Sequence, residues 1–155
     1  MMTVAEPDSV GRPWLHVFPT TFAPGELSPT GVAFEICVGL LKPRSRGRVT
    51  LASRDPEIPP RIDVNLLADP WDVASMVEGI RLARRLARTE PLASLHEGEL
   101  FPGDAVGDDA DALAQVLKAS VGPYNHANGT VRMGPRSDRS RPRAPWRARD
   151  RGRRA

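Results

Sequence analysis

The 155-residue chain has the length of one ordinary domain, and its 16 prolines and 13 glycines favour many turns over a helical bundle. Its single cysteine, Cys37, excludes a disulfide framework and a thiolate metal cluster. No apolar run approaches a signal peptide or the roughly 20 residues of a membrane span, so we expect a soluble, cytoplasmic protein without a membrane partner. The net charge of +3 is uneven, because residues 136–155 carry nine arginines and two aspartates, which leaves −4 for residues 1–135.

The N-terminal part is expected to build a sheet. Residues 1–13 are poor in apolar side chains and are interpreted as a loose lead-in. Residues 14–18 (WLHVF) favour a strand, which Pro19 either ends or places at a sheet edge. Residues 31–41 (GVAFEICVGLL) predict the strongest strand of the chain, buried on both faces.

The next segments suggest a hairpin. Residues 42–47 (KPRSRG) have the composition of a solvated cationic turn, and residues 48–51 alternate in polarity. We therefore predict that residues 31–41 and 48–51 pair as a hairpin. Three prolines between residues 55 and 60 exclude regular structure there, and residues 61–64 fit a short edge strand.

Two helices are expected after the strands. Asp69 and Pro70 are typical of a helix N-cap and first helical position, and Pro91 would end this helix. Its apolar residues recur on one face, and its arginines are interpreted as a solvated face: Arg81, Arg84, Arg85 and Arg88. A second helix is predicted from Asp108 to the break at residues 122–123.

Three sequence motifs follow one another along the chain. They are residues 40–49 (LLKPRSRGRV), residues 60–72 (PRIDVNLLADPWD) before an arginine-rich helix, and residues 124–134 (YNHANGTVRMG). The first resembles L-x-P-x-S-x-G-x-V and the third resembles H-x-x-G-T-x-x-M-G, both from the C-terminal region of the glucose–methanol–choline (GMC) oxidoreductases. We therefore expect residues 14–135 to be a partial C-terminal domain of that family.

The resemblance implies a fold and a chemistry. The fold is α+β, an antiparallel sheet backed by helices that forms the substrate-side layer over a flavin. His126 matches the histidine that faces the flavin, and Asn125 and Asn128 are candidate pocket residues beside it, although turn formation also explains two asparagines. In that chemistry a base accepts the hydroxyl proton of an alcohol substrate while the carbon hydride passes to FAD. Imidazole, with an ordinary pKa of about 6.5, suits such a base.

Two departures from the family pattern limit this expectation. The chain has no G-x-G-x-x-G motif, so we expect no cofactor-binding residues in it and no FAD bound by it alone. It also lacks the family's second downstream His or Asn. We expect the C-terminal portion of an alcohol oxidoreductase, such as a choline dehydrogenase-like enzyme, that is a truncated fragment, inactive alone and dependent on a separately encoded flavin-binding half. No H-E-x-x-H spacing supports a metal site.

The C-terminal tail leaves alternatives open. Residues 136–155 are predicted to be a disordered basic tail, which is either a frameshift product or an authentic extension. As an arm it would bind nucleic acid and other polyanions non-specifically. A nucleic-acid-binding protein and a small partner-binding module are therefore the alternative functions.

Overall fold

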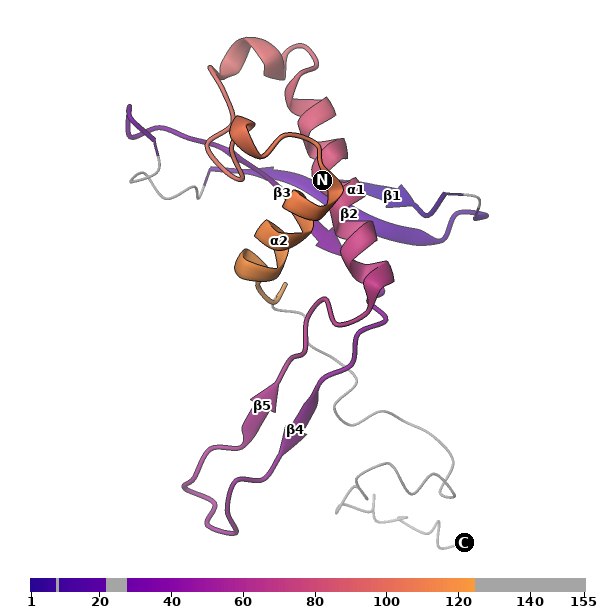
Figure 1. Cartoon of the computed structure of the whole chain (residues 1–155), viewed down its shortest axis with the longest axis vertical. Helices are drawn as coiled ribbons and strands as arrows, with labels where there is room; N and C mark the ends of the chain where they lie inside the picture. Colours follow the sequence, from indigo (N-terminus) through magenta and orange to yellow (C-terminus); the bar gives the residue numbers. More distant parts are fainter. Residues whose placement is uncertain (8, 22–27, 125–155) are drawn as a thin grey trace, which may run out of the picture. The chain divides into compact units, whose positions relative to one another are not determined.

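The computed structural model describes residues 1–7, 9–21 and 28–124 (Figure 1). The chain divides into two compact units, residues 1–122 and 123–155, and every helix and strand described below lies in the first. Strands and helices together make an α+β fold with antiparallel sheets and two α-helices. No helix in the described part is long and apolar enough to cross a membrane. The predicted disordered tail lies outside the described residues.

Three antiparallel strands form the first sheet, in the order β1 (Met2–Ala5), β2 (Pro13–Thr20) and β3 (Glu35–Leu40). The expectation of a loose lead-in over residues 1–13 is wrong for β1, which pairs with β2 from Met2 opposite Val17 to Ala5 opposite Pro13. Its stability comes from backbone hydrogen bonds to β2, and most of its side chains are exposed. Apolar content therefore did not indicate this strand.

The strand β2 continues through Pro19 instead of ending there. Pro19 lies opposite Ile36 of β3, and β2 is the middle strand of the three-stranded sheet. The expectation that Pro19 ends the strand or places it at a sheet edge is therefore wrong.

The strand β3 is not buried on both faces, contrary to the expectation for residues 31–41. It is an outer strand of its sheet, and within it Gly39 alone is fully buried. One helix, α1 (Pro70–Ala87), packs against it. The approach is close at Gly79, where an added Cβ would lie 2.5 Å from Val38 Cγ1. In the described part of the chain, α1 is the helix that packs against β3, so apolar composition overestimated the burial of this strand.

The predicted hairpin between residues 31–41 and 48–51 is also wrong. The strand β4 (Arg48–Thr50) pairs instead with β5 (Arg61–Asp63), as a separate two-stranded antiparallel sheet. The expected short strand at residues 61–64 is confirmed as β5. Residues 43–47 do not form a turn, because hydrogen bonds to the first turn of α1 hold them.

The two α-helices lie close to the positions that the sequence predicted. Asp69 caps α1 and accepts a 2.8 Å hydrogen bond from the amide of Trp71. The second helix, α2 (Ala110–Ser120), is capped by Asp109, one residue later than predicted. Two short 3₁₀ helices, η2 (Leu92–Leu95) and η3 (Asp104–Val106), lie between them.

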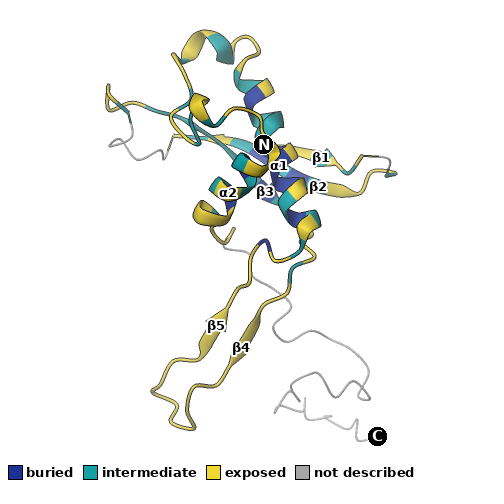
Figure 2. Ribbon diagram, in the orientation of Figure 1, coloured by how far each residue is buried: buried dark blue, intermediate teal, exposed yellow. Residues whose placement is uncertain are grey.

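A small core joins the helices. Its buried members are Leu67, Met76, Val77, Leu113 and Leu117 (Figure 2). In the sheet, Leu15 and Val17 of β2 are buried as well. Leu113 is fully buried, which is worth about 1.5–3 kcal/mol relative to an exposed side chain. With few residues of this kind in the described part, the net stability should be modest.

Candidate functional site

The predicted catalytic and pocket residues His126, Asn125 and Asn128 lie outside the described residues. Their roles stay predictions. The described part instead contains three polar assemblies around α1 that the sequence did not indicate.

The first assembly is a clamp made by Asp72, whose carboxylate is completely buried in the first turn of α1. It accepts hydrogen bonds from the amides of Arg44 and Ser45, at 2.7 and 2.8 Å, and from the Ser45 hydroxyl at 2.5 Å. The Ser45 oxygen in turn accepts from the amide of Asp69, at 3.0 Å. The position of Asp72 in the first turn of α1 also suits the positive end of the helix dipole. Its main partners are 27 and 28 residues away.

The clamp continues into the base of the β4–β5 hairpin. Arg46 Nη1 donates to three nearby carbonyls, and Asn65 Nδ2 donates to the carbonyl of Arg46 at 2.9 Å. At Gly47 an added Cβ would lie 2.1 Å from the carbonyl oxygen of Asp63. Asn65 and Leu67 both have positive φ, 49° and 55°, which is costly for leucine. Burial of Leu67 in the core offsets this strain.

The second assembly is a cationic surface pocket of about 250 Å³. The guanidinium of Arg44 lies 4.2 Å from the ring centre of Trp71, a cation–π contact. Trp14 also lines the pocket, and its buried Nε1 has no hydrogen-bond partner. The pocket contains three cations and one carboxylate, from Glu6, Arg12, Lys42 and Arg44. The carboxylate of Glu6 forms an ion pair with Arg12 at 3.1 Å.

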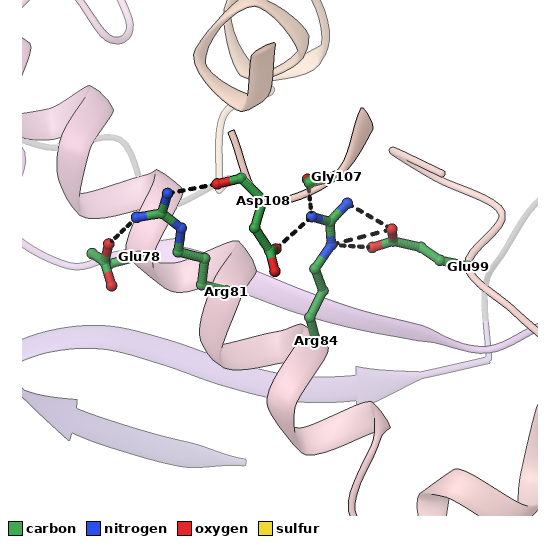
Figure 3. A network of polar contacts seen from close by, with 6 residues as sticks. All are labelled: Glu78, Arg81, Arg84, Glu99, Gly107 and Asp108. Atoms are coloured by element: carbon green, nitrogen blue, oxygen red, sulfur yellow. Dashed lines mark hydrogen bonds and ion pairs between the residues drawn. The ribbon is translucent and has the colours of Figure 1, made fainter. Parts of the chain in front are cut away.

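The third assembly is centred on Arg84, which corrects the expectation of a fully solvated arginine face (Figure 3). Arg84 is buried and makes paired contacts with Glu99, with Nη2 to Oε2 at 2.7 Å. It also bonds Asp108 Oδ1 at 2.8 Å and the carbonyl of Gly107. Arg81 bonds Glu78 and the carbonyl of Asp108, both at 2.6 Å.

The charges of this third assembly are mutually compensated. Hydrogen bonding to Glu99, with a smaller contribution from Asp108, raises the pKa of Arg84 above its ordinary value. Hydrogen bonding to Arg84 lowers the pKa of Asp108 below its ordinary 3.8. Both groups therefore stay charged near neutral pH and cannot exchange protons with a substrate. The assembly fastens the segment between the two helices onto α1, while Arg85 and Arg88 remain exposed as expected.

Two single residues also fit structural roles. Burial, followed by the nearby charge of Glu35, raises the pKa of Cys37, so its thiol is protonated at neutral pH and a poor nucleophile. His96 Nε2 lies 3.2 Å from the carbonyl of Ala87, and its ring meets Phe34 edge-on. No group of three potential metal ligands occurs among the described residues.

The N-termini of the two α-helices do not fit the pyrophosphate of a dinucleotide cofactor. A helix N-terminus attracts phosphate through its free amides and its positive dipole end. In α1 and α2, however, aspartates cap these ends, and Asp72 and Asp111 add further negative charge in the first turns. Phosphate would therefore meet carboxylates at both helices.

Comparison with known proteins identifies the family. A model of the GMC oxidoreductases matches residues 43–141, about two-thirds of the chain. The chain belongs to the GMC oxidoreductase family and corresponds to the C-terminal domain of that family. The match includes the Asp72 clamp, the β4–β5 hairpin, both α-helices and the segment with His126. It leaves out residues 14–42, which we had assigned to the domain, and extends six residues into the presumed tail.

Relatives in the GMC family carry different names and are much longer. The chain is 38% identical over 123 residues to a glucose dehydrogenase [FAD, quinone] of Drosophila pseudoobscura pseudoobscura, covering 72% of this chain and 19% of that protein. It is 34% identical over 120 residues to an alcohol dehydrogenase [acceptor] of Pseudomonas putida, covering 77% and 22%. It is 41% identical over 104 residues to a patulin synthase of Aspergillus clavatus, covering 66% and 16%. The chain thus spans about a fifth of the length of these relatives.

Proposed function

We propose that this chain is the substrate-side C-terminal portion of an FAD-dependent oxidoreductase that acts on the CH–OH group of an alcohol. The observation that carries the proposal is the family match over residues 43–141, which contains the H-x-x-G-T-x-x-M-G segment. A choline dehydrogenase-like activity is the finer form of this proposal. The names of two relatives, an alcohol dehydrogenase and a glucose dehydrogenase, support hydroxyl-bearing substrates.

His126 is the proposed base within this segment. A neutral imidazole accepts a proton near pH 7, because its ordinary pKa of about 6.5 leaves most of it unprotonated. We place it to accept the hydroxyl proton of the substrate. Asn125 and Asn128, on either side in sequence, would donate or accept hydrogen bonds that orient the hydroxyl. Activity should therefore rise with pH as the histidine loses its proton.

The cofactor would be held elsewhere. Because the aspartate-capped helices do not fit a pyrophosphate, we propose that the chain alone neither binds FAD nor oxidises alcohols. A flavin-binding portion of the GMC type, joined or separately encoded, would supply the cofactor. The chain then contributes the base and part of the substrate pocket.

Complementation tests this function. The P. putida alcohol dehydrogenase, with the segment matched by this chain removed, would be co-expressed with the full chain, and alcohol-dependent dye reduction measured. His126→Ala should lower kcat by about 10²–10⁴ while leaving the complex intact. The matched control is His96→Gln, whose amide can still donate to the carbonyl of Ala87 and should change kcat little. A fully active His126→Ala complex would overturn the assignment of the base.

A further inference from the structure

The cationic pocket is walled by segments that are far apart in the sequence. Its walls come from the region of β1 and β2, from residues 42–44 and from the first turn of α1. The amide of Leu41 donates to the carbonyl of Trp14 at 3.0 Å, and the amide of Arg44 donates to the buried carboxylate of Asp72. These hydrogen bonds hold the walls together without a ligand, and a pre-organised site loses little entropy when it binds one.

Two cations of the pocket have no anionic partner. Glu6 and Arg12 form an ion pair with each other, so their charges compensate. Neither the ammonium group of Lys42 nor the guanidinium of Arg44 forms an ion pair with a residue in the described ranges. Three cations and one carboxylate therefore leave two positive charges that the described part of the chain does not neutralise.

The hydrogen-bond donors of the pocket also favour an anion. One face of the Arg44 guanidinium lies over the Trp71 ring, and such stacking leaves the N–H groups at the edge of the guanidinium available for a planar, bidentate contact. The Nε1 donor of Trp14 is buried and has no acceptor among the described residues. An unpaired buried donor costs free energy, and an oxygen of a ligand would supply the acceptor.

We propose that this pocket binds the phosphate group of a small molecule, either a phosphate monoester or inorganic phosphate. A phosphate carries about −1.5 to −2 charges near pH 7, which matches the two uncompensated cations better than the single charge of a carboxylate does. The pocket volume of about 250 Å³ lies below the about 300–1,000 Å³ typical of pockets for drug-sized ligands, so the ligand is small. Asp69 and Asp72, which oppose phosphate at the start of α1, do not line the pocket. The inference does not depend on the proposed alcohol oxidation.

Titration of the full ¹⁵N-labelled chain with inorganic phosphate tests the site. The assigned indole N–H signals of the three tryptophans report binding, and sodium chloride at equal ionic strength is the reference for general screening. The Trp14 signal should shift saturably with phosphate. Arg44→Gln should raise the Kd about tenfold, because it removes charge-assisted hydrogen bonds. Lys42→Gln should raise it about threefold, because lysine contributes a point charge.

The matched control is Arg54→Gln. Arg54 is an exposed arginine in the connection between β4 and β5, outside the pocket, so the variant loses the same charge and its Kd should stay within about twofold of wild type. Arg44→Gln retains the backbone amide that donates to Asp72, so the clamp should persist. An unchanged urea midpoint for each variant would verify that the fold is intact.

The outcomes decide the site and its ligand. The pocket is wrong if phosphate gives no saturable shift at Trp14, if the shifts are confined to Trp146 in the arginine-rich tail, or if Arg54→Gln weakens binding as much as Arg44→Gln. Equal affinity for acetate would also overturn the proposal, because the charge match requires a dianion. Phenyl phosphate distinguishes the two sources: binding tighter than that of inorganic phosphate assigns a monoester, and weaker binding assigns inorganic phosphate.

Discussion

Replacing Asp72 by alanine removes the acceptor that joins residues 44–45 to α1. Three donors lose their partner: the amides of Arg44 and Ser45 and the Ser45 hydroxyl. A donor left unsatisfied in a desolvated site costs about 1–3 kcal/mol. The hydroxyl can rotate toward another acceptor, so we count one to two orphaned amides and expect a loss of about 2–5 kcal/mol.

This loss is large for a chain of this kind. Small domains have unfolding free energies of about 5–15 kcal/mol, and the small described core places this chain toward the lower end. With a urea m-value of about 1–3 kcal/mol per molar, the midpoint should fall by about 1–5 M. The variant should then be largely unfolded in dilute urea. Far-UV circular dichroism and tryptophan fluorescence would follow the transition.

Asp111→Ala is the matched control for this experiment. Asp111 also lies in the first turn of a helix, but it is exposed. Its removal forfeits only the interaction with the helix dipole, about 0.3–1 kcal/mol. If the Asp72 variant loses no more stability than the Asp111 variant, the clamp does not contribute as the geometry indicates.

Three further predictions concern charge, cofactor and tail. Asp108→Asn should lower the urea midpoint at about pH 7, and the difference from wild type should shrink toward about pH 3. Arg84 lowers the pKa of Asp108 in the folded state, so the stabilisation is present above the ordinary pKa of 3.8 and is lost as pH falls through the pKa of the folded state. A deficit independent of pH would contradict this. The purified chain should be colourless, since aspartates cap both α-helices; flavin absorbance at near-equal molar amounts would refute it. Deleting residues 136–155, with nine arginines, should abolish salt-sensitive DNA binding and leave the circular dichroism of the fold unchanged. A truncated chain that is unfolded would show that the tail is part of the fold, and one that still binds DNA at high salt would show that the folded part binds DNA.

Local signals predicted the elements that depend on neighbouring residues. The Asp69–Pro70 pair correctly marked the start of α1, because capping needs only a side chain and the amides two or three residues later. The short strand at residues 61–64 was found directly after a proline-rich segment. The family resemblance came from short ordered motifs, and the match over residues 43–141 confirms it.

Tertiary structure decided everything that depends on a distant partner. Sequence alone determined that β4 is a strand, but its partner is β5 because Asp72, 27 residues away, holds Ser45 out of a turn. Arg84 has the same side chain as the next residue, Arg85, and it is buried only because Glu99 and Asp108 lie beside it in space. Burying a charge costs several kcal/mol unless partners compensate it. Those partners are supplied by the fold, so the periodicity of the helix could not distinguish Arg84 from the exposed Arg85.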